Sequence, residues 1–164
     1  RYSSSAASDV YKRQVQFNKL TIIIGSLALI PVFIYPLMKR VTWWPQIFLG
    51  ITFNWGALLG WLSLSNDFSS IYPILLYLAC IFWTVGYDTI YAHQDKDDDI
   101  VLNLKSSAIK LGENTKNALL IFYAIFFIIF AVILFSLSNS IIIHLAILSL
   151  LIHLVFQIIY FHYQ

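Results

Sequence analysis

Acidic side chains are concentrated in one short segment of this 164-residue sequence. Five of its eight Asp and Glu residues lie between Asp88 and Asp99. Three of these five, Asp88, Asp95 and Asp99, are separated by seven and then four residues. In a continuous helix these separations place all three carboxylates on one face. The sequence therefore predicts a shared acidic site.

Crowded carboxylates at such a site predict a bound cation, because they repel one another unless a positive charge lies among them. Asp95 and Asp99 are one helical turn apart and suit Mg²⁺, which usually takes its other ligands from water and a substrate phosphate. Lys105, together with Lys96 and Lys110, would add positive charge for the same anion. The simpler alternative is a solvated acidic loop that binds nothing.

Other ligand motifs do not fit. An EF-hand loop starting at Asp95 has Ile100 where glycine is needed and Ser106 where glutamate is needed. Neither the GxxxxGK[ST] nor the GxGxxG phosphate-binding pattern occurs. Three histidines are spaced nine residues apart, so successive rings point to opposite faces of a helix, and we expect structural roles for them: His144, His153 and His162.

The sequence as a whole is too apolar for a soluble domain. Hydrophobic residues make up 60% and charged residues 11%, whereas soluble domains carry about 25% charged residues. Five runs approach the length of about 20 residues that a membrane-spanning helix needs: Leu20–Leu37, Pro45–Leu64, Ile71–Tyr87, Asn117–Leu137 and Ile141–Tyr160. We expect an all-α, polytopic transmembrane helical bundle.

Basic residues predict the orientation of these spans. The first and third connections between spans contain all six lysines and arginines of the connections: Lys39, Arg40, Lys96, Lys105, Lys110 and Lys116. The second and fourth connections contain none. Alternate connections lie on one side of the membrane, so the positive-inside rule places the acidic segment on the cytoplasmic or matrix side. Lys19 is a minor exception on the other side.

Three further features are expected to serve packing or membrane anchoring. Trp43 and Trp44 are typical of an aromatic belt at the membrane surface. Gly56 and Gly60 form a GxxxG pair, which predicts a close approach by a neighbouring helix. Cys80, the only cysteine, is expected to be a small core residue.

Two stretches resemble the UbiA-type intramembrane aromatic prenyltransferases. DTIYAHQDKDDD followed by LKSSAIKLGENTK resembles the second aspartate-rich region of that family, and YPLMKRVTWWPQIFLGITFNWGALLGW resembles the segment between its two aspartate motifs. The resemblance runs from about Val15 to about Lys116 and is strongest for the branch that acts on 4-hydroxybenzoate in ubiquinone biosynthesis. It implies Mg²⁺-dependent transfer of a polyprenyl group from polyprenyl diphosphate to the ring carbon ortho to the hydroxyl.

The same resemblance implies roles for individual residues. Asp95 and Asp99 match the DxxxD motif that holds Mg²⁺ against the diphosphate. Tyr35 and Lys39 match a YxxxK motif, with Lys39 expected near the diphosphate. Arg40 matches an arginine expected to engage the diphosphate or the benzoate carboxylate. These residues form the expected catalytic and substrate-binding set.

Three more residues are expected to line the polar cavity of the site. Asp88 and Lys105 match the DTxYA and KS positions of the family. Asn54 is a polar residue inside the second predicted span, and a hydrogen bond between packed helices is an equally good interpretation of it.

The resemblance covers only part of the family pattern. The family has nine spans and a first aspartate-rich motif, which we do not find before Leu20. We therefore expect residues 15–164 to form a partial prenyltransferase domain that is inactive alone. Residues 1–14 are interpreted as a non-native or disordered leader.

Alternatives to this function remain open. The acceptor could be a naphthoate, homogentisate or haem instead of 4-hydroxybenzoate. A divalent-cation transporter with the aspartates at its mouth, or a non-catalytic membrane scaffold, belongs to a different class. The bilayer is the expected environment, in a bacterial inner or mitochondrial inner membrane, and the net charge of +2 is too small to predict a nucleic-acid partner.

Overall fold

The computed structural model describes residues 18–65 and 68–161, and every regular element in this part of the chain is helical. The elements, in chain order, are α2 (Lys19–Leu27), α3 (Leu29–Ile34), the 3₁₀ helix η1 (Tyr35–Leu37), α4 (Met38–Val41), α5 (Pro45–Phe53), α6 (Gly56–Ser65), α7 (Tyr72–Ala92), α8 (Lys96–Val101), α9 (Ser107–Leu111), the 3₁₀ helix η2 (Gly112–Asn114), α10 (Thr115–Leu137) and α11 (Ile141–Tyr160). The expected leader and His162 lie outside the described residues.

Five helical stretches are long and apolar enough to cross a membrane: Lys19–Val41, Pro45–Ser65, Tyr72–Ala92, Ser107–Leu137 and Ile141–Tyr160. They coincide with the five predicted spans, and the expectation of an all-α membrane protein is confirmed. The fourth stretch starts ten residues earlier than predicted, because the short helices α9 and η2 lead directly into α10.

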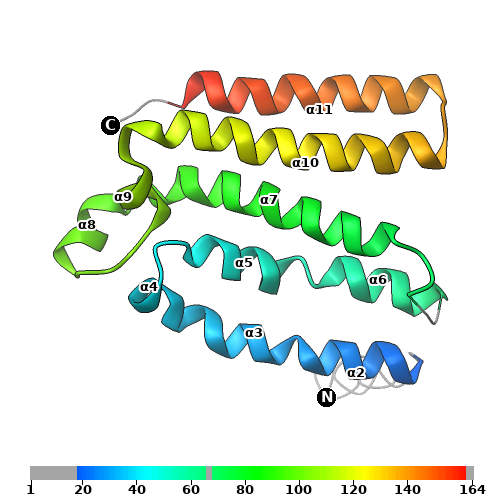
Figure 1. The fold of residues 1–164 in the computed structure, drawn as a ribbon, viewed down its shortest axis with the longest axis horizontal. Coiled ribbons are helices and arrows are strands. Elements are labelled where there is room, and N and C mark those ends of the chain that lie inside the picture. Colours follow the sequence, from blue (N-terminus) through cyan, green and yellow to red (C-terminus); the bar gives the residue numbers. More distant parts are fainter. Residues whose placement is uncertain (1–17, 66–67, 162–164) are drawn as a thin grey trace, which may run out of the picture.

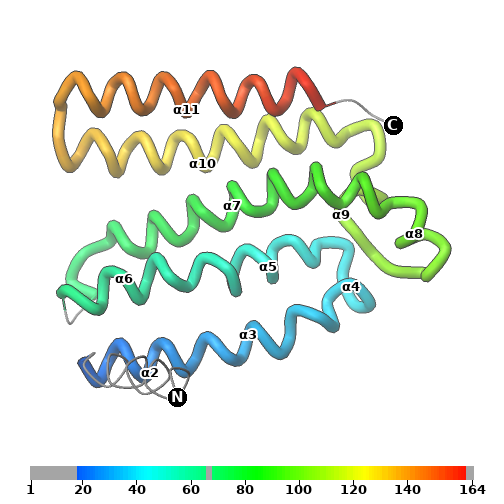
Figure 2. The backbone as a smooth tube through the Cα atoms, turned by 180° about the vertical axis from the view of Figure 1, so that it is seen from behind, coloured from blue at the N-terminus to red at the C-terminus, as the bar shows by residue number. Residues whose placement is uncertain are grey.

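The spans lie side by side in chain order, and neighbours run in opposite directions (Figures 1 and 2). Helix α7 packs against α5 and α6 on one side and against α10 on the other, and α10 also packs against α11. The short helices α4, α8 and α9 gather at one end of the bundle, and α2 begins at the opposite end (Figure 1). The two basic connections therefore lie together, as the charge pattern predicted.

The core is centred where α7, α10 and α11 meet. Its buried members are Ala79, Tyr123, Phe126 and Leu154. Many other large apolar side chains of the spans are exposed, as expected for helices whose outer faces contact lipid rather than water. The cluster holds α7 in place, and the acidic segment follows directly after α7.

Close helix approaches occur at glycines other than the predicted pair. A Cβ added at Gly56 or at Gly60 would meet nothing within 4 Å, so the GxxxG prediction is wrong for the described residues. A Cβ on Gly50 would lie 3.2 Å from the backbone of Ile81. A Cβ on Gly86 would overlap the ring of Tyr123. Contact between helices depends on which faces meet, and the spacing of two glycines on one helix does not determine this.

Candidate functional site

The acidic segment forms two helices and not one. Helix α7 ends at Ala92, and α8 begins at Lys96 with Asp95 as its N-cap residue. The prediction that a single helix carries all three aligned carboxylates is therefore wrong. Three aspartates occupy the first turn of α8, where negative charge favours the N-terminus of a helix, and this explains why a new helix starts here.

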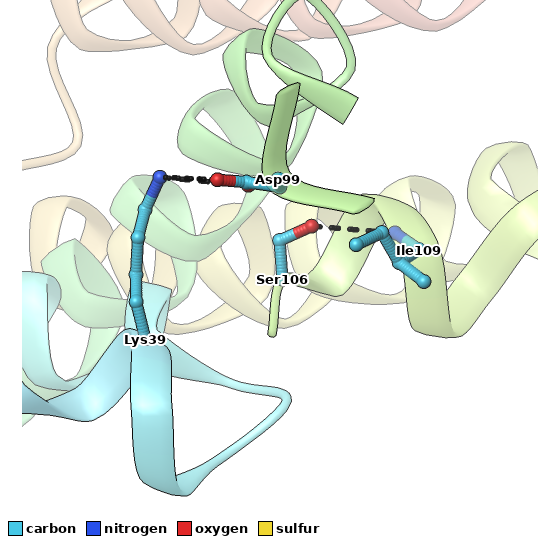
Figure 3. Close-up of polar contacts among 4 residues, drawn as sticks. All are labelled: Lys39, Asp99, Ser106 and Ile109. Atoms are coloured by element: carbon cyan, nitrogen blue, oxygen red, sulfur yellow. Dashed lines mark hydrogen bonds and ion pairs between the residues drawn. The ribbon is translucent and has the colours of Figure 1, made fainter. Parts of the chain in front are cut away.

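Lys39 and Asp99 form an ion pair in the space between α4 and α8. The ammonium of Lys39 lies 3.2 Å from one carboxylate oxygen of Asp99 and 3.5 Å from the other (Figure 3). The side chain of Asp99 is 4% exposed and that of Lys39 is 39% exposed. The structure thus joins two predicted site residues that are 60 positions apart in the sequence.

Asp88 and Tyr35 lie in the same electrostatic environment. Asp88, in the last turns of α7, is half-buried and interacts electrostatically with both Lys39 and Asp95. Tyr35, at the start of η1, interacts with Asp88 and with Lys39. Lys39 is therefore the common positive neighbour of the aspartates contributed by α7 and α8.

Lys105 lies beside this group rather than among its carboxylates. Its ammonium donates a hydrogen bond to the carbonyl oxygen of Val41 at 3.0 Å and lies 5.8 Å from the centre of the Trp43 ring. Its backbone N–H donates to the carbonyl oxygen of Lys39 at 2.7 Å. Lys105 thus connects the segment after α8 to the end of α4.

Arg40 and Asn54 lie apart from the ion pair. Arg40 is exposed and lines a surface hollow with Leu102, Asn103 and Leu104. The amide of Asn54 donates to the carbonyl oxygens of Gly50 and Cys80 and to Thr84 Oγ1. Those partners belong to α5 and α7, so the structure favours the helix-packing interpretation of Asn54.

Buried polar residues that sequence reasoning did not single out fasten the acidic segment to the bundle. The hydroxyls of Thr89 on α7 and Ser107 on α9 are 2.8 Å apart and buried. Ser106 is the N-cap of α9, and its hydroxyl accepts a hydrogen bond from the N–H of Ile109 (Figure 3). A polar N-cap before a short helix is the one signal that could have identified Ser106.

His93 makes a second polar connection. Its Nδ1 lies 2.8 Å from the carbonyl oxygen of Thr89, and its Nε2 lies 3.2 Å from Thr115 Oγ1 at the start of α10. Burial lowers the pKa of His93 below its ordinary value, and the nearby positive charge of Lys96 acts in the same direction. In contrast, His144 and His153 lie on α11, where they contact Ser140 and Gln157 one turn away.

An aromatic cavity of about 430 Å³ lies between the C-terminal ends of α7 and α11. The residues that line it include Tyr87, Tyr91, His93 and Phe161. Tyr87 interacts electrostatically with Asp88, so the cavity adjoins the acidic group. It has the size of pockets that hold small organic ligands.

The chemistry of the donor set fits Mg²⁺ shared with a substrate. Among residues 18–65 and 68–161, no three His, Cys, Asp or Glu side chains lie close enough to hold a metal by themselves. Asp95 and Asp99 nevertheless supply hard carboxylate oxygens, and Mg²⁺ is usually held by one or two carboxylates together with water and phosphate oxygens. The ammonium of Lys39 beside Asp99 shows that this position favours positive charge.

Comparison with known proteins identifies the family. A model of the UbiA prenyltransferase family matches residues 5–164. The chain is 51% identical over 102 residues to the mitochondrial 4-hydroxybenzoate polyprenyltransferase of Arabidopsis thaliana, a match that covers 62% of this chain and 25% of that protein. The human protein of the same name is 52% identical over 99 residues, covering 60% of this chain and 27% of the relative.

A solved structure has the same fold. The apo structure of a UbiA homolog from Aeropyrum pernix K1 superposes with a TM-score of 0.73 at 24% identity, covering 94% of this chain and 59% of that one. The matches with the two curated relatives span about a quarter of the length of each. Because the family match covers all of the described helices, the chain belongs to the UbiA prenyltransferase family.

Proposed function

We propose that the protein carrying this chain transfers a polyprenyl group from polyprenyl diphosphate to 4-hydroxybenzoate, in the pathway to ubiquinone. The main support is the convergence of Lys39 with Asp88, Asp95 and Asp99 at one end of a membrane bundle. That end offers both a positively charged side chain for a diphosphate and carboxylates for the metal ion bound to it. The names of the relatives in Arabidopsis thaliana and Homo sapiens support 4-hydroxybenzoate as the acceptor.

In this reaction the allylic C–O bond of the substrate breaks and the diphosphate leaves with the bonding electrons. The ring carbon ortho to the hydroxyl forms the new C–C bond and then loses its proton. Asp95 and Asp99 would hold Mg²⁺, which when bound neutralises charge on the departing diphosphate. Lys39 would shift from Asp99 toward the same diphosphate, and exposed Arg40 would add positive charge at this end of the bundle.

The aromatic cavity next to Asp88 provides a candidate position for the acceptor ring. Its lining combines aromatic faces with the polar groups of His93, Gln94 and Gln157, a combination that suits a ring bearing a hydroxyl and a carboxylate. Helices that exclude water from the bound substrate would protect a reactive allylic cation from hydrolysis. The long prenyl chain would extend along the exposed apolar faces of the spans into the bilayer.

The basic connections are proposed to face the cytoplasm of a bacterium or the matrix of a mitochondrion. Both α4 and the α8–α9 segment lie at the end of the bundle that carries this charge (Figure 1), and positively charged connections remain on that side. An inner membrane of either kind is compatible with this orientation.

The test follows labelled 4-hydroxybenzoate into a lipid-extractable product, in membranes that carry the full-length protein. We expect product with Mg²⁺, none after chelation, and a loss of at least a hundredfold in Asp95→Ala. Asp97→Ala is the matched control, because Asp97 is also exposed near the start of α8 but does not belong to the DxxxD motif.

Equal rates for Asp95→Ala and the parent protein would refute the role of this carboxylate. No product in membranes where a known prenyltransferase is active would exclude 4-hydroxybenzoate and direct the search to naphthoate, homogentisate or haem. Flux of a divalent cation without any prenyl diphosphate would instead favour the transporter.

A further inference from the structure

A tight turn at the end of α8 sets the direction of the segment that follows. Asn103 has a positive φ of 53°, and the N–H of Leu104 donates to the carbonyl oxygen of Asp99 at 2.8 Å. The N–H of Asn103 donates to the carbonyl oxygen of Ile100 at 3.1 Å. This pair of hydrogen bonds around a left-handed residue is the Schellman motif, and asparagine is one of the residues that adopts it readily.

The motif delivers Lys105 to the carboxyl end of α4. There the backbone N–H of Lys105 donates to the carbonyl oxygen of Lys39, and its ammonium donates to that of Val41, the last residue of α4. A positive charge at this position also interacts favourably with the negative end of the helix dipole. Lys105 therefore makes two hydrogen bonds to α4, one from its backbone and one from its side chain.

These contacts close a ring with the ion pair. Lys105 contacts the backbone of Lys39, the side chain of Lys39 contacts the carboxylate of Asp99, and the backbone of Asp99 contacts Leu104, the residue before Lys105. Lys39 and Asp99 are thus connected through their backbones as well as their side chains. The position of the Lys39 ammonium relative to Asp99 depends on the whole ring.

We propose that Lys105 is a positioning residue, which holds the segment between α8 and α9 against α4 and so sets the placement of Lys39 and Asp99. Its ammonium is directed at Val41 and Trp43, so it acts on the diphosphate site through Lys39 and not by touching the substrate. The consequence for catalysis rests on the proposed function, whereas the structural role does not.

The first measurement is hydrogen–deuterium exchange of the full-length protein in nanodiscs, with no substrate and with metal chelated. Lys105→Met keeps the aliphatic stem over Trp43 and removes only the charged donor. We expect the amides of residues 99–106 to exchange about fivefold faster in this variant, which corresponds to the loss of one hydrogen bond of ordinary net strength.

Two variants serve as controls. Lys105→Arg retains a charged donor within reach of Val41 and should keep the exchange of the parent protein. Lys116→Met removes the same charge from an exposed position at the same end of the bundle and should change nothing in residues 99–106. Exchange in α10 and α11 reports whether each variant is folded.

Kinetics then separate positioning from direct binding. A positioning role predicts a several-fold fall in kcat for Lys105→Met, together with the faster exchange already present without substrate. A raised KM for the diphosphate with unchanged kcat and unchanged substrate-free exchange would overturn the proposal, because it would make Lys105 a ligand. If the parent protein transfers no prenyl group, the exchange result still supports or refutes the structural role by itself.

Discussion

Removing Lys39 should destabilise the metal-free chain more than removing both charges of its ion pair. Lys39→Met leaves the carboxylate of Asp99, whose side chain is 4% exposed, without its cation. Breaking a fully buried pair costs about 3–5 kcal/mol, whereas exposed pairs contribute less than about 1 kcal/mol. Because Lys39 is 39% exposed, we expect an intermediate loss of about 2 kcal/mol in the free energy of unfolding.

The double variant Lys39→Met/Asp99→Asn removes both charges and should lose only about 1 kcal/mol or less. The coupling energy of the cycle is the sum of the losses in Lys39→Met and Asp99→Asn minus the loss in the double variant, and is then at least about 1 kcal/mol. Unfolding in mixed micelles with a chelator present, followed by tryptophan fluorescence, measures all four proteins. The exposed residues Lys110 and Asp98 give a control cycle that should show no coupling.

A coupling energy of less than about 0.5 kcal/mol, the usual uncertainty of additivity, would refute the reasoning. It would mean that Asp99 is solvated or compensated without Lys39. The ion pair would then not explain how the segment after α7 is held close to α4. The metal site would have to be interpreted without a cation that stabilises Asp99 in advance.

Two further predictions concern packing and pH. Gly86→Ala places a methyl group against the Tyr123 ring, at 2.8 Å from Cδ1. Because Tyr123 is 2% exposed, the overpacking cost of up to about 3 kcal/mol should outweigh a gain of about 1 kcal/mol in helix propensity. Gly60→Ala, with open space around it, should show only the gain. Equal thermal stability of the two variants would contradict this prediction. Burial lowers the pKa of His93 from its ordinary 6.5, so the unfolded chain takes up a proton first on acidification. The free energy of unfolding should therefore be highest above pH 6.5 and fall as the pH drops below it. Unfolding measured across this range should show a smaller fall in His93→Gln.

The failed glycine prediction shows where a local pattern is insufficient. Gly56 and Gly60 have the spacing of a helix-packing motif, but their faces meet no neighbouring helix among the described residues. Gly50 and Gly86 stand alone in the sequence and carry the close contacts with Ile81 and Tyr123. The rotation of each helix about its axis decides this, and that rotation depends on all of its neighbours.

The aspartate segment also shows that a local pattern does not predict tertiary contacts. The sequence predicted that Asp88, Asp95 and Asp99 act in one place; in the structure Lys39 pairs with Asp99 and interacts with Asp88, which in turn interacts with Asp95. The sequence-based prediction assumed one continuous helix, whereas the helix is interrupted between Ala92 and Lys96. Asp99 reaches α4 through its ion pair with Lys39, and Lys105 binds the backbone of α4; helical periodicity alone does not predict these contacts.

The sequence by itself determined the spans and their alternating directions. A bilayer requires about 20 apolar residues for each crossing, and this property can be counted along one dimension. It also determined which end carries the basic connections, because charge restricts each connection to one side. Only the tertiary structure decided that Lys39 meets Asp99 and that Lys105 fastens their backbones together. Those contacts join residues about 60 positions apart, and their partners follow from the packing of α4 beside α8.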